Sequence, residues 1–117
     1  MVAQVRPAQT ASWLGEQARA VTGKRALVLD VREPWALRQA AVAAGPDFDV
    51  RAIPMNSVPA RLAELDPAQP LACLCHHGAR SNQVAHFLER AGFERVANIA
   101  GGIDAWSAEC DPSIPRY

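Results

Sequence analysis

The chain has 117 residues, 50% hydrophobic and 21% charged, a length that suits one compact domain able to bury its own core. Twelve Lys and Arg residues balance twelve Asp and Glu residues, so the chain lacks the basic excess typical of nucleic-acid-binding domains. No run of about 18 apolar residues is present, and an odd count of three cysteines argues against a disulfide framework. We therefore expect a single domain over residues 1–117 in the reducing cytoplasm, with neither a nucleic acid nor a membrane as its partner.

The first half of the chain alternates strand and helix patterns, which indicates an α/β fold. In chain order, we expect a strand at Ala3–Arg6, a helix at Thr10–Val21 with Thr10 as its cap, a strand at Ala26–Val31, a helix at Pro34–Gln39 and a strand at Arg51–Ile53. Pro34 suits a first helical turn because its missing N–H would have no intrahelical partner there. Residues 40–49 show no assignable pattern.

The second half continues the alternation. We expect a helix begun by Ser57 that includes Leu62 and Leu65, a strand at Leu71–Cys75, a helix at Arg80–Ala91, a strand at Arg95–Ile99 and a short helix at Ile103–Ser107 that packs Trp106. Apolar residues recur three and four positions apart in Arg80–Ala91, and Gly92 offers a left-handed cap. The runs at Ala26–Val31 and Leu71–Cys75 lack polar alternation, as do strands that helices cover on both faces. The sequence predicts a central parallel sheet of five strands with helices on both faces.

Chemically active side chains gather in the segment Cys75–Ser81, Cys-His-His-Gly-Ala-Arg-Ser, between a buried strand and an amphipathic helix. In open parallel sheets, ligands bind beyond the carboxyl ends of the strands. A helix start offers unpaired N–H groups, which favour the thiolate of a cysteine placed there. Gly78 lets the backbone curl so that several N–H groups converge on one anionic atom, and Arg80 adds a permanent positive charge.

The three cysteines have different interpretations. A cysteine at a strand end is more often a buried core thiol, but the Gly, Arg and Ser that follow Cys75 favour an active-site loop. Packing alone explains Cys73, and Cys110, in a polar segment, has no assigned role. A zinc site formed by Cys73, Cys75 and a histidine is disfavoured, because Cys-x-Cys on a strand is a poor spacing for tetrahedral ligands.

Four segments, in this order, resemble the motifs of the rhodanese-like sulfurtransferases of the small single-domain kind. They are Leu29–Trp35 (Leu-Asp-Val-Arg-Glu-Pro-Trp), Ile53–Pro54, Cys75–Ser81 (Cys-x-x-Gly-x-Arg-Ser), and Gly92–Val96 together with Ala100–Trp106 (Ala-Gly-Gly-Ile-Asp-Ala-Trp). The chain departs from the family at Ala44–Arg51, which stands where relatives usually read Gly-His-Ile-Pro-Gly-Ala.

The resemblance implies a single rhodanese-like domain that passes a sulfane sulfur from a small donor such as thiosulfate to cyanide or a thiol, including a protein thiol. Cys75 would attack the donor and carry the sulfur as a persulfide, and Arg80 would orient the donor's oxygens. This double displacement needs neither a metal nor a cofactor. The rest of the loop would lend backbone donors and shape the pocket: His76, His77, Gly78, Ala79 and Ser81.

The roles of one carboxylate, Asp30, and of the two loop histidines stay open at this point. Asp30 ends a strand at the same sheet edge, where it either positions Arg80 and the loop or caps the following turn, and Arg32 is its expected salt-bridge partner. His76 and His77 are adjacent in a tight loop, where neighbouring side chains rarely point the same way. We expect both to face substrate or solvent rather than to remove a proton from the cysteine.

Two other classes of function fit parts of this pattern. Cysteine phosphatases and arsenate reductases also place a Cys loop before an Arg at a helix start, but they hold five residues between the two, whereas four separate Cys75 from Arg80. A smaller loop suits one sulfur atom better than a tetrahedral oxyanion. The second alternative is a rhodanese-like module that only binds a partner, and the intact Cys, Gly and Arg of the loop argue against it.

Overall fold

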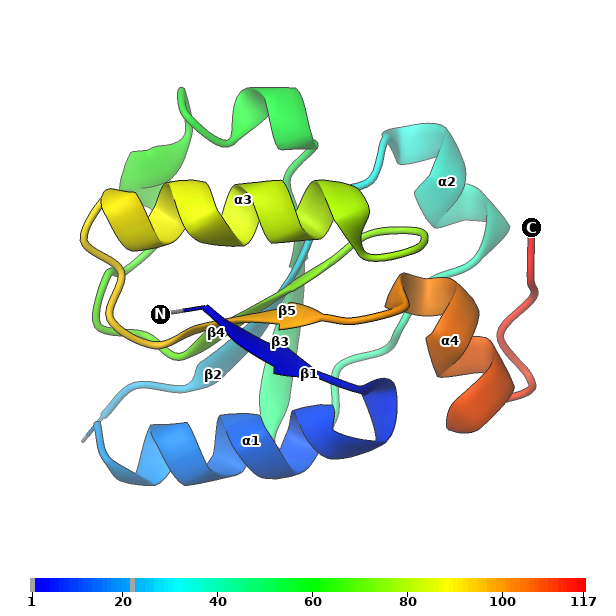
Figure 1. The fold of residues 1–117 in the computed structure, drawn as a ribbon, viewed down its shortest axis with the longest axis horizontal. Helices are drawn as coiled ribbons and strands as arrows, with labels where there is room; N and C mark the ends of the chain where they lie inside the picture. Colours follow the sequence, from blue (N-terminus) through cyan, green and yellow to red (C-terminus); the bar gives the residue numbers. More distant parts are fainter. Residues whose placement is uncertain (1, 22) are drawn as a thin grey trace.

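Within residues 2–21 and 23–117, which this computed structural model describes, five parallel strands form the centre in the order β1-β5-β4-β2-β3 (Figure 1). The strands are β1 (Ala3–Val5), β2 (Ala26–Asp30), β3 (Phe48–Ala52), β4 (Leu71–Leu74) and β5 (Val96–Ile99). The helices are α1 (Pro7–Arg19), α2 (Pro34–Gln39), α3 (Ala79–Arg90) and α4 (Gly102–Glu109), with 3₁₀ turns at Met55–Ser57 and Leu62–Glu64. The predicted α/β class and parallel five-stranded sheet are confirmed.

Helices cover both faces of the sheet, as predicted. Figure 1 shows α3 along one face and α1 along the other, with α2 and α4 near the end where the strands finish. Successive residues of β2 serve two separate cores. Leu29 packs in one core with Leu88 of α3, and the preceding Val28 packs in the other with Leu14 of α1. In the part of the chain described, no helix is both long and apolar enough to cross a membrane.

Most element boundaries agree with the sequence to within a residue. Helix α2 spans Pro34–Gln39 as expected, and α3 lies one residue earlier than predicted. Gly92, just past α3, has φ +100°, which agrees with its predicted role as a left-handed cap. Trp106 of α4 is buried, 9% exposed, in the core on the α1 side of the sheet.

The predicted start of the first helix is wrong. Helix α1 begins one turn before Thr10, with Pro7 in its first turn. The Gln9 side chain accepts the Arg6 N–H at 3.0 Å, which satisfies a donor at the helix start. Thr10 is buried inside the helix, and its hydroxyl donates to the Arg6 carbonyl at 3.1 Å. It therefore bonds back along the helix instead of capping it.

Two other segments differ from their expected form. The helix expected to begin at Ser57 is absent: Ser57 ends a 3₁₀ turn at Met55–Ser57, and a second 3₁₀ turn spans Leu62–Glu64. Pro59 removes a backbone donor, while Val58 and Leu65 are each held in the core. Strand β3 starts at Phe48, three residues before its expected position, and pairs along its length with β2. The unassigned residues 40–49 thus contain the start of this edge strand.

The sequence departure at Ala44–Arg51 lies around the start of β3. Arg25, the residue before β2, anchors this segment by donating to the carbonyl oxygens of Gly45 and Pro46 at 2.8 and 3.1 Å. It also pairs with Asp49 at 2.8 Å. Because parallel strands start at one end of the sheet and finish at the other, Gly45 and Pro46 lie at the opposite end from Cys75. Arg51, near the end of β3, pairs with Leu29 at the level of Cys73.

Gly102 sets how closely α4 approaches the loop after β4. Its φ is +62°, and a Cβ there would lie 2.4 Å from the carbonyl oxygens of both Cys75 and His76. Those oxygens accept hydrogen bonds from the N–H groups of Ile103 and Asp104, at 2.9 and 3.1 Å. Only glycine fits between the helix and the loop.

We therefore expect Gly102→Ala to destabilise the fold far more than Gly92→Ala. Both glycines have positive φ, but nothing lies within 4 Å of a Cβ placed on Gly92. Left-handed strain should cost Gly92→Ala about 1–2 kcal/mol, whereas Gly102→Ala adds a clash with backbone that must move. Thermal unfolding measures the loss of stability in each variant, because each kcal/mol lowers the Tm of a domain of this size by about 4 °C. Equal losses in the two variants would show that α4 does not depend on this close approach.

Candidate functional site

Cys75 lies just past the end of β4, with its sulfur atom at the N-terminus of α3. The side chain is 3% exposed, and its Sγ accepts hydrogen bonds from the backbone N–H groups of Gly78 at 3.1 Å and Ser81 at 3.3 Å. The N–H of Ser81 belongs to the first turn of α3, where the helix offers it no partner. Two backbone dipoles and the positive end of a helix therefore favour negative charge on this sulfur.

Gly78 makes this convergence possible. It has φ +103°, and a Cβ there would lie 3.0 Å from the Gly101 nitrogen and 3.3 Å from the Ile99 carbonyl oxygen. The left-handed conformation turns the chain back so that Gly78 N–H faces the sulfur just before α3 begins. The curled loop predicted from the sequence is thus present, and the close packing against the end of β5 is a further reason for glycine.

Asn98 of β5 holds both residues whose N–H groups reach Cys75. It is 3% exposed, its Oδ1 accepts from the Ser81 hydroxyl at 2.6 Å, and its Nδ2 donates to the Gly78 carbonyl at 3.2 Å. The same Nδ2 donates to the Gln4 side chain at 2.9 Å, which joins the network to β1. Sequence reasoning missed Asn98. An amide in an otherwise apolar strand was the one local signal.

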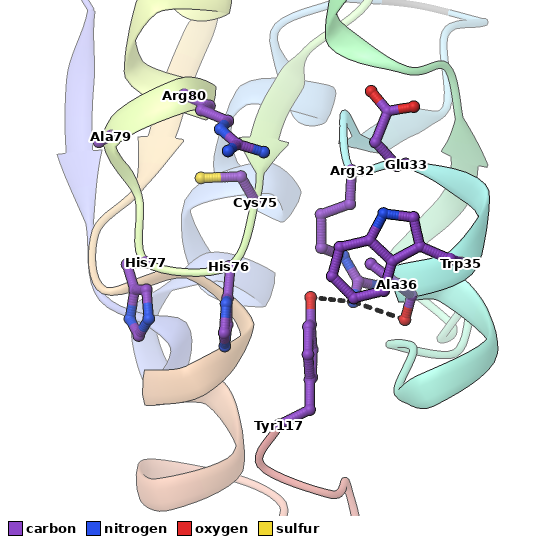
Figure 2. Close-up of a pocket in the computed structure, with 10 residues that line it drawn as sticks. All are labelled: Arg32, Glu33, Trp35, Ala36, Cys75, His76, His77, Ala79, Arg80 and Tyr117. Carbon is purple, nitrogen blue, oxygen red and sulfur yellow. Dashed lines mark hydrogen bonds between the residues drawn. The ribbon is translucent and has the colours of Figure 1, made fainter.

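A pocket of about 240 Å³ opens beside Cys75, between the loop and the start of α2. The lining residues are Arg32, Glu33, Trp35, Ala36, Cys75, His76, His77, Ala79, Arg80 and Tyr117. Figure 2 shows the Arg80 guanidinium next to the Cys75 side chain, on the same side of the loop. Arg80 is exposed and makes no hydrogen bond or ion pair with any described residue, so its charge is free for a ligand.

Asp30 and Arg32 form a buried ion pair behind the pocket. The Asp30 carboxylate accepts the Arg32 backbone N–H at 3.1 Å and the guanidinium at 2.6 Å. The remaining donors of Arg32 go to the carbonyls of Ala36 and Ala40, at 3.2 and 2.8 Å, and to the Tyr117 hydroxyl at 2.9 Å. Asp30 therefore caps the turn after β2 and pairs with Arg32, and within the described residues no contact joins it to Arg80.

The two loop histidines point away from the sulfur. Figure 2 shows both rings on the far side of the loop from Cys75 Sγ, stacked with centroids 4.0 Å apart. The Tyr117 ring stacks on the other face of His76, at 4.1 Å and 4° between planes. Burial, and then the charge of His77, lower the pKa of His76, which keeps this ring neutral near pH 7. Neither histidine is placed to act as a base on Cys75.

Trp35 and Tyr117 form part of the pocket that the sequence did not reveal as functional. Trp35 is the last residue of the Leu29–Trp35 motif and is 55% exposed, which is unusual for a tryptophan. Tyr117 carries no local signal, because its place beside the loop depends on how the chain beyond α4 folds back. That return is visible in Figure 1, where the red segment runs up beside α4 toward α2.

The other cysteines are in different surroundings. Cys73 is fully buried, and burial, with a smaller effect of Cys75, raises the pKa of its thiol. It stays a neutral core thiol, as the sequence suggested. Cys110 is exposed at the end of α4, and burial together with two neighbouring carboxylates raises the pKa of its thiol. No group of three His, Cys, Asp or Glu among the described residues could hold a metal.

Comparison with known proteins gives a consistent match. The model of the "Rhodanese-like domain" family matches residues 10–109. The "Rhodanese-like/PpiC domain-containing protein 12, chloroplastic" of Arabidopsis thaliana is 41% identical over 96 residues, which are 79% of this chain but only 30% of that protein. The "Thiosulfate sulfurtransferase GlpE" of Stutzerimonas stutzeri is 30% identical over 91 residues, 78% of this chain and 79% of that protein.

A solved structure agrees with the fold. The rhodanese-related protein from Thermoplasma volcanium has a TM-score of 0.72 at 28% identity, and the match covers 98% of this chain and 99% of that one. The likeness thus extends over nearly the whole length of both chains.

The hydrogen bonds of Asn98 generate a prediction about the reactivity of Cys75. Asn98→Ala releases Gly78 and Ser81, so their N–H groups should hold the thiolate less firmly. We expect alkylation of Cys75 by iodoacetamide at neutral pH to fall roughly tenfold, the equivalent of about 1.5 kcal/mol for a bond to a charged group. Peptide mass analysis separates Cys75 from Cys110.

A matched asparagine, Asn56, is exposed on a 3₁₀ turn, and Asn56→Ala should leave the alkylation rate unchanged. Thermal unfolding of both variants shows how much of any change reflects stability. If Asn98→Ala unfolds earlier but its Cys75 still reacts with iodoacetamide at the original rate, Asn98 has a purely structural role.

Proposed function

This chain belongs to the family of rhodanese-like domains, and on that basis we propose that it is a sulfurtransferase that carries sulfane sulfur as a persulfide on Cys75. The observation that carries the proposal is the environment of one sulfur atom. Cys75 Sγ accepts two backbone N–H groups at the start of α3 and faces a pocket that an unpaired guanidinium lines. A nucleophilic thiolate needs this kind of environment.

In the first half-reaction, the Cys75 thiolate attacks the outer sulfur of the donor. With thiosulfate, a new S–S bond forms to Cys75, the S–S bond of thiosulfate breaks, and sulfite leaves with the electron pair. No proton has to move, so no general base is needed. This agrees with the position of His76 and His77, which lie away from Sγ in Figure 2. The name of the Stutzerimonas relative supports thiosulfate as the donor.

The loop then stabilises the persulfide anion. The first-turn N–H groups of α3, at Ala79 and Arg80, have no intrahelical acceptors and lie beside those that already reach Cys75. Arg80 contributes a charge that persists at any pH near neutrality, and its guanidinium suits the paired oxygens of a sulfonate group. We assign His76 and His77 a role in shaping the pocket, and Asp30 with Arg32 a role in holding its far wall.

In the second half-reaction, a thiophilic acceptor attacks the terminal sulfur of the persulfide. When the acceptor is cyanide, the product is thiocyanate, and when it is a thiolate, the product is a new persulfide. In both cases the S–S bond to Cys75 breaks and the cysteine recovers its electron pair as a thiolate. The protein returns to its starting state, and the reaction needs no redox partner.

We predict that Cys75→Ser abolishes thiosulfate:cyanide sulfur transfer, because a serine hydroxyl is not ionised near neutral pH and forms no persulfide. Cys73→Ala and Cys110→Ala, which alter a neutral core thiol and an exposed thiol, should keep most of the activity. Thiocyanate formation measures the rate, and intact mass shows whether one sulfur atom is gained and then lost. Near wild-type activity in Cys75→Ser would overturn the proposal. Robust hydrolysis of an aryl phosphate that depends on Cys75 would favour the phosphatase alternative.

Arg80→Ala should weaken the use of thiosulfate. Loss of a charge-assisted hydrogen bond of about 1.5–3 kcal/mol corresponds to roughly 10- to 150-fold in kcat/KM. Arg80→Lys should recover only part, because an ammonium group lacks the paired donors of guanidinium. The matched control is Arg90→Ala, which removes an exposed arginine from the far end of the same helix. An equal loss in both variants would show that the effect comes from net charge rather than from contact with the donor.

A further inference from the structure

The pocket beside Cys75 has an aromatic wall that a small inorganic donor does not use. This wall consists of Trp35 and Tyr117, whose rings meet edge to face with centroids 6.0 Å apart at 87°. Trp35 is 55% exposed, whereas large hydrophobic side chains elsewhere in the described chain are more covered. Figure 2 shows the two rings across the pocket from Cys75 and Arg80.

One half of the wall, the Tyr117 ring, is held in place before any substrate arrives. The Tyr117 hydroxyl accepts from Arg32 at 2.9 Å, and Arg32 is itself buried and fully bonded. The preceding Arg116 pairs with Asp104 of α4 through two hydrogen bonds of 3.0 Å. Ile114, three residues before Tyr117, is 7% exposed and packs in the core on the α1 side of the sheet. The segment therefore holds the Tyr117 ring in place, so little conformational entropy is lost when a ligand contacts it.

Unpaired positive charge in the pocket is confined to one side. Arg80 is the unpaired cation at the loop, while the guanidinium of Arg32 is taken up by Asp30, backbone carbonyls and Tyr117. Glu33, which also lines the pocket, repels a second negative charge on the far side. A dianion such as thiosulfate is thus favoured next to Cys75 and disfavoured at the wall.

The size of the pocket also exceeds the needs of such a donor. Its volume of about 240 Å³ approaches the range of about 300–1,000 Å³ found for pockets that bind small organic ligands. Such pockets combine apolar and aromatic walls with a few polar groups that set orientation. The aromatic wall and the loop of Cys75 divide these two roles between them.

We propose that the aromatic wall binds the hydrocarbon part of a low-molecular-weight organic thiol, which is the acceptor of the second half-reaction. This inference rests on the proposed sulfurtransferase function and names the acceptor class. The acceptor's thiolate attacks the terminal sulfur of the Cys75 persulfide, the S–S bond breaks, and Cys75 keeps the electron pair. The product leaves as an organic persulfide. Contact with the wall orients the thiolate for this attack.

The test uses the purified full chain with sulfur loaded on Cys75 and compares two thiols as acceptors of that sulfur. Phenylmethanethiol carries an aromatic ring, whereas 2-mercaptoethanol has only a short aliphatic chain. The measured quantity is the ratio of their kcat/KM values, with cyanide as an internal standard. Trp35→Ala and Tyr117→Ala should each lower this ratio roughly 2- to 12-fold, the effect of losing one aromatic contact. Trp35→Phe and Tyr117→Phe keep an aromatic ring and should restore most of it.

Arg38→Ala is the matched control, because Arg38 is exposed on the same helix as Trp35 but does not line the pocket. It should leave the ratio unchanged. If the persulfide forms and passes to both thiols with the same ratio in every variant, the wall does not bind the acceptor and the inference is wrong. A cysteine-containing peptide serves as a further acceptor: if the alanine variants slow transfer to the peptide only, the acceptor is a protein thiol, and the inference is again wrong. If no persulfide forms on the wild-type Cys75 at all, the proposed function itself fails, and the inference fails with it.

Discussion

The site depends most on the contact between the loop of Cys75 and the N-terminus of α4. The carbonyl oxygens of Cys75 and His76 accept hydrogen bonds from the first turn of that helix, across a gap that only Gly102 leaves open. These oxygens carry partial negative charge and would repel a thiolate if they turned inward. Since α4 holds them on the outside of the loop, the inside is left to N–H groups. The start of α4 thus binds the loop's carbonyl oxygens, and N–H groups at the start of α3 donate to the sulfur.

A second support comes from the sheet. Asn98 ties the Gly78 carbonyl and the Ser81 hydroxyl to β5, and its contact with Gln4 continues to the edge strand β1. Buried amides of this kind are retained only when their hydrogen bonds are made, because an unpaired polar group in the core costs about 1–3 kcal/mol. The geometry around Cys75 is therefore set by the packing of whole elements, not by the seven-residue loop alone.

The sequence predicts those features that depend on neighbours along the chain. Strands β2 and β4 were found because both faces are covered, which leaves an uninterrupted apolar run. The Cys75 loop was found because a cysteine, a glycine and an arginine mark a strand-to-helix turn. The start of α1 was missed although Pro7 marks it, because Thr10 is also a good capping residue in isolation.

The features that the sequence did not predict depend on contacts between distant segments. Asn98 lies 23 residues after Cys75, and Tyr117 reaches His76 from 41 residues further along the chain. No spacing rule connects such positions. Asp30 was open to two interpretations because a carboxylate at a strand end fits a turn cap and a catalytic support equally well. In the structure, Asp30 accepts the Arg32 backbone N–H, as a turn cap does, and also pairs with the Arg32 guanidinium.

The buried position of Arg32 also affects how substrates approach. Because its charge is neutralised within the fold, the entrance presents one free guanidinium, that of Arg80, against the carboxylate of Glu33. The chain as a whole carries no net formal charge. Long-range attraction of anions, which accelerates encounter in strongly charged active sites and weakens as salt screens it, has little to act on here. Capture of a donor should therefore depend on short-range contacts inside the pocket and vary little with ionic strength.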